Sequence, residues 1–299
     1  MKRVAKFLLY SVLTIVALAG LALGGVYAYT GWRLGKTYSV TVPRITTVAG
    51  DPVAIERGRY LVHKVSMCAE CHGEDLGGKV MIDSPVMARL FASNLTRGRG
   101  GLGATYSDED FVRAITHGVR KDGHSVIFMP SQDYHFSAGD VAGLVAYLRS
   151  LPPVDRDTPQ PSIGPMARIL NVFVGLPLLP AQLIDHNSRT LRAEADVSSA
   201  EAAGQSLIGA GGCRGCHGPQ LTGEGGMSGA ANLTPTGLAG WQETDFKRAL
   251  REGRRPNGTT IVPEMPRAFG AMSDDDLSKI FAYLKSLPPT GTKSKRQTG

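Results

Sequence analysis

The 299 residues predict about two domains plus additional segments, the 42% apolar content is sufficient for packed cores, and 37 glycines with 18 prolines predict much loop. The formal charge of +7 lies in the flanks: residues 1–50 and 290–299 carry nine basic and no acidic residues, whereas residues 51–153 and 193–289 have net charges of −1 and −2. Because a duplex-binding domain needs basic residues on its own surface, this distribution argues against a nucleic-acid partner.

An apolar segment lies near the start of the chain. Residues 7–29 carry no formal charge, and about 20 apolar residues are enough for a helix to cross a bilayer. Three basic residues precede this segment, which by the positive-inside rule places the N-terminus in the cytoplasm and the bulk of the chain outside. We expect residues 1–30 to form a transmembrane anchor and residues 31–50 a polar tether. The alternative is a cleaved signal peptide, with a possible cleavage site at residues 17–19.

The remainder of the chain is an internal repeat. Five landmarks recur in the same order: Cys-x-x-Cys-His-Gly at 68 and 213, Asn-Leu-Thr at 94 and 232, Phe-x₆-Gly at 111 and 246, Met-Pro at 129 and 265, and Ser-Leu-Pro-Pro at 150 and 286. The offset drifts from 145 to 136, so the first copy holds nine extra residues, mostly in the loop after its cysteine motif. We expect a tandem duplication of one domain, at residues 51–153 and 193–289.

Each copy predicts three short helices in the same order. The first helix leads to the cysteines, the second follows the repeated Phe, and the third carries one apolar stripe and stops at Leu-Pro-Pro. The expected N-terminal caps of the outer helices are Asp51-Pro52, Ser137-x-x-Asp140, Ser198-x-x-Glu201 and Ser273-x-x-Asp276. No segment shows sustained strand alternation. Three short helices bury little apolar area for about 100 residues, so we expect a large apolar group in each core.

All four cysteines belong to two Cys-x-x-Cys-His motifs, the signature of c-type haem attachment. Two cysteines three positions apart can form thioether bonds to the two vinyl groups of one haem, and the adjacent histidine can bind its iron. A four-cysteine zinc site would leave both histidines unexplained, and thioredoxin-like chemistry would require a βαβ pattern. A pair of disulfides is a further alternative. Export of the chain agrees with haem attachment, which takes place outside the cytoplasm.

With these motifs each copy resembles a class I cytochrome c domain, and the whole resembles the membrane-anchored dihaem cytochromes c of bacteria. The resemblance implies an all-α fold of two tandem domains, each with about 100 residues around one covalently attached haem c. It implies thioether bonds from Cys68, Cys71, Cys213 and Cys216 and proximal iron ligation by His72 and His217. It further implies that Met129 and Met265, each followed by Pro, are the distal iron ligands.

The two methionines have alternatives. A methionine is more often core filler, but of nine methionines only Met129 and Met265 correspond between the copies with the same Pro and the same downstream spacing. His117, His124 and His135 have no counterparts in the second copy and could displace Met129, although such residues are more often surface or loop histidines.

The resemblance also suggests partners for the haem propionates. Tyr106 and Trp241 both lie five residues before the helix Phe, where the family places an aromatic donor. Asn94 and Asn232 lie in loops and could bind a propionate, or could simply brace turns.

Residues 154–192 are Pro-rich at first and then strongly apolar, whereas a flexible linker would be polar. We expect this linker to pack against its own domains; contact with a haem edge, the membrane or a partner is the alternative. Residues 290–299 form a basic tail.

Two irons with His and Met ligands would have no open position, which suits one-electron transfer. We therefore expect a membrane-tethered electron carrier, not itself an enzyme, with its haem domains on the periplasmic side of the inner membrane. Redox proteins would be its partners: a membrane oxidoreductase, a soluble cytochrome or a dehydrogenase. Its tandem domains resemble those in the cytochrome subunits of quinoprotein alcohol dehydrogenases. The alternative is a dihaem peroxidase, which needs one haem that opens to peroxide, and the near-symmetry of the two Met-Pro motifs argues against it.

Overall fold

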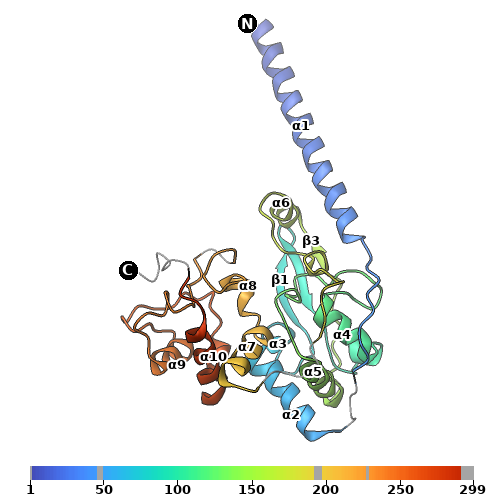
Figure 1. The fold of residues 1–299 in the computed structure, drawn as a ribbon. Helices are drawn as coiled ribbons and strands as arrows, with labels where there is room; N and C mark the ends of the chain where they lie inside the picture. The colour runs from blue at the N-terminus through green and yellow to red at the C-terminus, as the bar shows by residue number, and fades with distance from the viewer. Residues whose placement is uncertain (1, 46–49, 192–196, 227–228, 291–299) are drawn as a thin grey trace.

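The computed structural model describes residues 2–45, 50–191, 197–226 and 229–290. A long N-terminal helix projects from a body made of two helical domains that lie side by side (Figure 1). This helix-rich architecture agrees with the predicted fold class. Nearly all of the expected basic tail, residues 291–299, lies outside the described residues.

Helix α1 (Lys2–Leu34) is the projecting helix, and it continues four residues beyond the anchor expected from the sequence. By length and hydropathy it could cross a membrane, and its most apolar 18 residues are not buried against the rest of the chain. The segment after it contacts the first domain. The backbone N–H of Tyr38 donates to the carbonyl of Gly123 at 2.8 Å, and Thr37 forms a β-bridge with His124. Residues 37 and 38 are therefore attached to the first domain.

The first domain has the three expected helices and several shorter ones. Ser107 and Ser137 each form a complete capping box, with Asp110 and Asp140, and Asp51 caps α2 in front of Pro52. The helical segments are α2 (Pro52–Tyr60), the π-helix η1 (Leu61–Val65), α3 (Cys68–His72), the 3₁₀ helix η2 (Leu102–Ala104), α4 (Asp108–His117) and α5 (Ala138–Ser150).

The second domain repeats this order. Its helical segments are α7 (Ala200–Ala210), α8 (Cys213–His217), α9 (Glu243–Glu252), the 3₁₀ helix η4 (Arg267–Ala271) and α10 (Asp274–Ser286). One expected cap was wrong by a residue: the hydroxyl of Ser199, not Ser198, accepts the backbone N–H of Ala202 and begins α7. Ser273 caps α10 as expected, by accepting the N–H of Asp276.

In both domains the first and last helices cross at a glycine. A Cβ atom on Gly58 in α2 would lie 1.9 Å from the carbonyl oxygen of Gly143 in α5. A Cβ atom on Gly204 in α7 would lie 2.0 Å from the carbonyl oxygen of Lys279 in α10. Since real Cβ atoms do not approach so closely, each crossing requires glycine on the first helix. The matching positions show that the two copies share the same helix packing.

A small antiparallel sheet in the first domain was not predicted. It has the order β1-β2-β3, with β1 (Lys79–Ser84) and β2 (Ala88–Ala92) forming a hairpin and β3 (Ser162–Ile163) supplied by the linker. The hairpin falls in the loop where the first copy holds extra residues. Its exposed residues do not alternate regularly in polarity, and β3 pairs from more than 70 residues away, so the sequence pattern did not reveal it.

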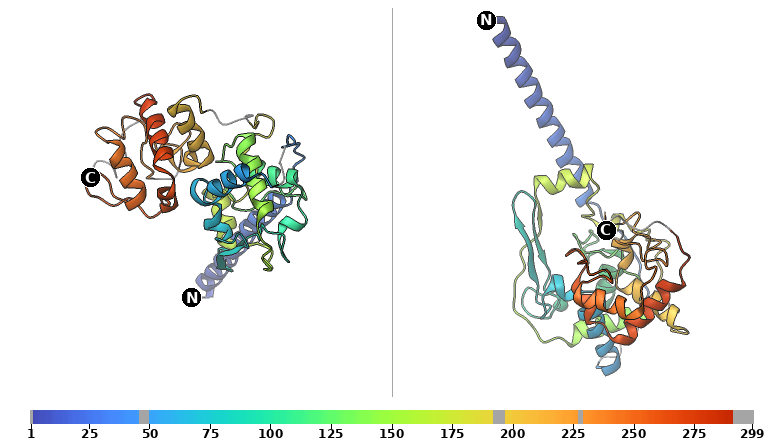
Figure 2. Two further views of the ribbon diagram at one scale, coloured as in Figure 1. Left: turned by 90° about the horizontal axis from the view of Figure 1, so that it is seen from below. Right: turned by 90° about the vertical axis from the view of Figure 1, so that its left-hand side faces the viewer.

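The linker folds back onto the first domain and onto α1. Its helix α6 (Pro165–Phe173) and the short 3₁₀ helix η3 (Pro180–Gln182) lie where α1 meets the body of the protein. Figure 2 shows α6 running across the end of α1. Arg33 of α1 donates to the side chains of Asn171, at 2.9 Å, and Gln182. The pairing of β3 in the linker with β2 of the first domain is the packing expected for the linker.

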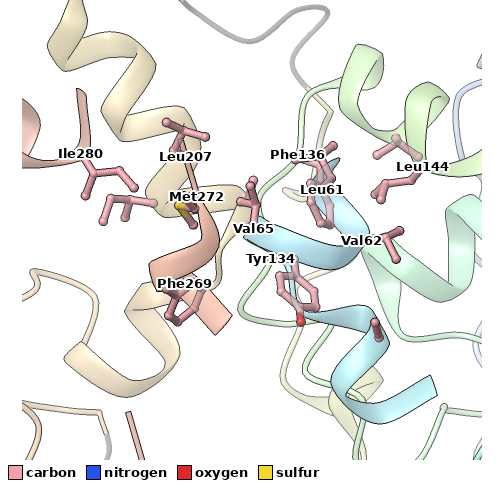
Figure 3. Close-up of a cluster of buried hydrophobic side chains, with 14 of the residues drawn as sticks. Leu61, Val62, Val65, Tyr134, Phe136, Leu144, Leu207, Phe269, Met272 and Ile280 are labelled. Atoms are coloured by element: carbon pink, nitrogen blue, oxygen red, sulfur yellow. The ribbon is translucent and has the colours of Figure 1, made fainter. Parts of the chain in front are cut away.

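The two domains share a continuous apolar core (Figure 3). Val65 of η1 faces Met272 and Leu207 of the second domain. Polar contacts surround this core: the hydroxyl of Ser66 donates to the carbonyl of Ala210 at 2.9 Å, and the hydroxyl of Tyr60 donates to a carboxylate oxygen of Asp276 at 2.5 Å. The domains therefore pack directly on one another.

Candidate functional site

Each cysteine motif forms one short helix, and the residue on either side of that helix has a positive φ angle. Helix α3 follows Met67 with φ +54°, and α8 follows Gly212 with φ +65°. The glycines directly after His72 and His217 have φ +85° and +79°, which favours glycine. The sequence Cys-x-x-Cys-His-Gly is therefore a compact helical turn with both cysteines and the histidine within five residues.

All four cysteines are unpaired thiols and half-buried. Burial raises the pKa of the Cys68 and Cys213 thiols to about 12, so both thiols are neutral. Among the described residues no group of three or more Cys, His, Asp or Glu side chains is placed to hold a metal ion. The arrangement therefore provides no cluster of thiolates for a four-cysteine zinc site, and it provides paired thiols that suit thioether formation.

The two motif histidines are held in the same way. The Nδ1 atom of His72 donates to the carbonyl of Ser93 at 2.8 Å, and the Nδ1 atom of His217 donates to the carbonyl of Ala231 at 2.8 Å. Burial lowers the pKa of both rings, which keeps them neutral. With Nδ1 donating, each ring can present Nε2 to a metal, the usual arrangement of a metal-ligating histidine. The donor set in each domain thus fits a covalently attached haem.

The carbonyl acceptors were missed by the sequence analysis because any residue can supply a backbone carbonyl. A signal was nevertheless present: in both copies the acceptor directly precedes the repeated Asn-Leu-Thr landmark.

The two candidate methionine ligands lie at matching places: Met129 between α4 and α5, and Met265 between α9 and α10. Met129 is half-buried, and its carbonyl accepts the N–H of Ser131 at 2.8 Å. The linker holds this loop, because the N–H of Phe128, at φ +62°, donates to the carbonyl of Leu178 at 2.9 Å. Met265 is half-buried and packs against the apolar core. Iron ligation by either methionine stays a prediction.

The three histidines considered as alternatives to Met129 have other contacts. The Nδ1 atoms of His117 and His186 lie 3.1 Å apart, and burial lowers the pKa of His117 to about 4. His124 lies 3.4 Å from a carboxylate oxygen of Asp122. His135 is exposed, with Nδ1 3.2 Å from the carbonyl of Asp133.

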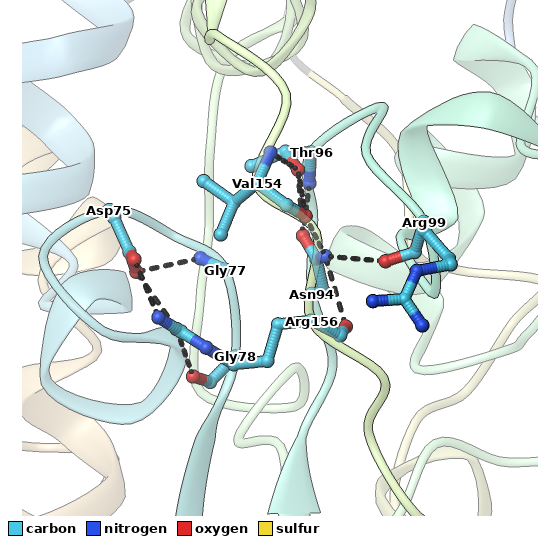
Figure 4. A network of polar contacts seen from close by, with 8 residues as sticks. All are labelled: Asp75, Gly77, Gly78, Asn94, Thr96, Arg99, Val154 and Arg156. Atoms are coloured by element: carbon cyan, nitrogen blue, oxygen red, sulfur yellow. Dashed lines mark hydrogen bonds and ion pairs between the residues drawn. The ribbon is translucent and has the colours of Figure 1, made fainter.

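Asn94 and Asn232 are fully buried and make matching contacts. The Nδ2 atom of Asn94 donates to the carbonyl of Val154 at 2.7 Å, and its Oδ1 accepts the N–H of Thr96 at 2.9 Å (Figure 4). In the second copy, Asn232 donates to the carbonyl of Thr290 at 3.0 Å. These contacts attach the chain after Leu-Pro-Pro to the loop before α4 or α9. They are the bracing role that the sequence left open; a propionate contact of either asparagine stays a prediction.

Tyr106 and Trp241 occupy similar positions at the edge of the apolar core, and both are half-buried. The ring of Tyr106 packs against Phe111 with centroids 5.5 Å apart, and burial raises the pKa of its hydroxyl. Their role as propionate donors also stays a prediction.

The two cysteine motifs lie next to the domain interface. A Cβ atom on Gly215, inside the second motif, would lie 2.5 Å from Cγ of Asp133 in the first domain. A Cβ atom on Gly212 would lie 3.2 Å from the ring of Tyr134, whose hydroxyl donates to the carbonyl of Ser66, two residues before Cys68. Asp133, Tyr134 and Ser66 of the first domain therefore lie between the two cysteine motifs.

Comparisons with known proteins agree with this arrangement. A family model described as cytochrome c matches residues 201–288, and one described as cytochrome c oxidase, cbb3-type, subunit III matches residues 53–148. The chain is 28% identical, over 86% of its length, to the alcohol dehydrogenase (quinone) cytochrome c subunit of Gluconobacter oxydans. It is 30% identical, over 82% of its length, to the gluconate 2-dehydrogenase cytochrome c subunit of Pantoea cypripedii. The chain spans about three fifths of the length of these two relatives, at 60% and 61%.

Proposed function

Since the two halves of this chain are cytochrome c domains, we propose that it carries electrons as a membrane-bound dihaem cytochrome c subunit of a dehydrogenase complex. The observation that carries the proposal is the repeated site: two Cys-x-x-Cys-His helices, each with a neutral histidine held by a backbone carbonyl. Relatives whose names describe cytochrome subunits of alcohol, gluconate and fructose dehydrogenases support the dehydrogenase partner.

Two haem c groups would be held by this chain, one in each domain. Cys68 and Cys71 would attach the first, and Cys213 and Cys216 the second. His72 and His217 would be the proximal ligands of the iron, and Met129 and Met265 the distal ones. When bound, haem c supplies one-electron chemistry between Fe(II) and Fe(III), and a thioether ligand raises the reduction potential.

The packing of the two domains supports electron transfer between the two sites. Ser66, two residues before the first motif, donates to the carbonyl of Ala210, three residues before the second. Two redox groups held on directly packed segments exchange electrons without a diffusional encounter, so the rate is independent of protein concentration.

The N-terminal helix supports the proposed location. Helix α1 is long and apolar enough to span a bilayer, and the basic residues at its N-terminus support a location of the domains on the periplasmic side of the inner membrane, by the positive-inside rule. The substrate of the associated dehydrogenase is a property of the catalytic subunit.

A spectroscopic redox titration of the purified protein tests this function. We expect two covalently attached haems, two one-electron steps, and a ferric methionine-to-iron charge-transfer band. Met129→Leu and Met265→Leu should each remove about half of this band, because each variant changes one of the two sites. Met272→Leu is the control, since Met272 is a buried core residue outside the Met-Pro pair.

Three outcomes would contradict the proposal. A single haem would exclude the dihaem assignment, and an undiminished charge-transfer band in either ligand variant would exclude that methionine. A high-spin ferric haem that reacts with peroxide would indicate a peroxidase instead of an electron carrier.

A further inference from the structure

Helix α6 in the linker has an apolar face that the described residues cover only in part, since Leu170 at its centre is half-buried. Met166, Leu170 and Phe173 follow each other at i, i+4 and i+7 and so share one face of the helix. Phe173 is 73% exposed and Met166 41% exposed. The buried positions, Ala167 and Asn171, lie on a different face and attach the helix to the protein.

This face lies where α1 leaves the apolar stretch. The guanidinium of Arg168 donates to the hydroxyl of Thr30 at 2.6 Å and lies 4.6 Å from the ring centroid of Tyr27. Arg33 of α1 donates to the side chain of Asn171. Because the uncharged residues of α1 end at Trp32, these contacts fix α6 at the level where a spanning helix would leave the bilayer.

The surroundings of α6 also suit a lipid surface. Residues 158–184 contain no acidic residue and one basic residue, Arg168. Phe173 is followed by Val174, which is 73% exposed, and the turn of the β1–β2 hairpin next to α6 carries Val86, which is 55% exposed. The N–H of Met166 donates to the carbonyl of Val86 at 3.0 Å, which holds the hairpin turn beside the helix.

We propose that α6 is a second membrane contact, which lies in the outer bilayer interface with Met166, Leu170 and Phe173 among the lipid chains. An interfacial helix has this pattern: an apolar face on one side and a polar or basic side chain, here Arg168, on the opposite side. The occupant of the face is lipid because α6 is held beside the end of α1, whose exposed Tyr29 and Trp32 suit the aromatic belt of a bilayer.

This inference rests on the proposed membrane span of α1, and it adds a consequence for orientation. One helix would leave the domains free to rotate about their attachment. Contact at α6 as well would fix one side of the first domain toward the membrane, with α2 (Pro52–Tyr60) at the opposite end of that domain (Figure 1).

The experiment measures immersion depth in the full-length holoprotein in phospholipid nanodiscs that contain no other protein. Phe173→Cys, Leu18→Cys and Val53→Cys each receive one nitroxide label, since the four native cysteines are consumed as thioethers. Val53 is the matched control, because it is 76% exposed, apolar, and lies on α2. The absorbance spectrum of the bound haem in each variant confirms that the domains are folded.

We expect the label at Phe173 to collide more often with oxygen than with a water-soluble nickel complex, at a depth of about 5–10 Å below the headgroups. The label at Val53 should show the reverse order.

A label at Phe173 with the aqueous behaviour of Val53, while Leu18 is lipid-immersed, would overturn the contact at α6 alone. An aqueous label at Leu18 would overturn the membrane span of α1 and the inference with it. Shielding of Phe173 from both quenchers would indicate a protein contact, such as a second copy, instead of lipid.

Discussion

The imidazole rings of His72 and His217 show how a single backbone contact prepares a ligand. A carbonyl at Nδ1 fixes which nitrogen carries the proton, and burial keeps the ring neutral, so the orientation and charge needed for a metal bond exist in the protein itself. The cysteines and histidines of the site follow directly from the Cys-x-x-Cys-His pattern. Their carbonyl partners do not, because the contact depends on the main chain of a distant loop.

A second pair of rings makes stability depend on pH. His117 is buried with its Nδ1 atom 3.1 Å from that of His186, and Arg189 adds positive charge nearby. Burial is the main cause that lowers the pKa of His117 to about 4. The unfolded chain therefore binds a proton at this residue near pH 6.5, whereas the folded protein binds it only near pH 4. The free energy of unfolding should therefore fall as pH drops from about 6.5 to about 4, by at most about 3 kcal/mol.

Thermal unfolding of wild type and His117→Gln between pH 7.5 and 4.5 measures this contribution. The decrease in stability should be smaller in the variant, while His135→Gln, which changes an exposed histidine, should retain the wild-type dependence. Parallel pH curves for wild type and His117→Gln would show that this pair does not set the acid sensitivity.

At the level of helices and strands, the close crossings at Gly58 and Gly204 determine how each domain is packed. Neither position has room for a Cβ atom, since the neighbouring atom is a backbone carbonyl that cannot move as a side chain can. Nothing in the local sequence distinguishes these two glycines from the 35 others, because their requirement arises from the opposite helix.

Substitution of Gly58 or Gly204 by Ala should lower the free energy of unfolding by about 1–3 kcal/mol, the usual cost of overpacking. Chemical denaturation measures the loss. Gly31→Ala is the control, because Gly31 is helical and a Cβ atom there would meet no neighbour within 4 Å. Stability equal to wild type in Gly58→Ala would show that the two helices can separate without cost.

The predicted helices were confirmed wherever a local signal was present. The apolar spacing in α5 and α10 and the serine caps in front of these two helices depend only on neighbouring residues. The pairing of β2 with β3 depends on residues that are distant in the sequence. Residues Ser162–Ile163, for example, become a strand only because the linker returns to β2.

At the level of the whole molecule, the domain interface makes the two cytochrome domains one structural unit. The repeat predicted two domains, but their contact could not be predicted, because Val65, Ser66 and Ala210 have no shared sequence signal. The hydroxyl of Tyr60 connects the domains through a hydrogen bond to Asp276 and a hydrogen bond from the N–H of Ser273 at 3.0 Å.

Calorimetry of Tyr60→Phe tests this coupling. A hydrogen bond to a charged group contributes about 1.5–3 kcal/mol, so its loss should separate one cooperative transition into two. Tyr147→Phe is the control, because its hydroxyl contacts His63 within the first domain at 2.9 Å, and it should shift the first domain without separating the transitions. Identical thermograms for the two variants would show that Tyr60 does not couple the domains.

The attachment of α1 to α6 has a consequence for how the protein meets its partners. Arg33 and Arg168 connect the two helices by hydrogen bonds, so under the proposed membrane span the sites would stay closer to the bilayer than on a long flexible chain. A membrane-bound partner would then be found by lateral diffusion in two dimensions at a constant height. For such an encounter the relevant quantity is the number of molecules per membrane area, and the volume of the surrounding compartment has little influence.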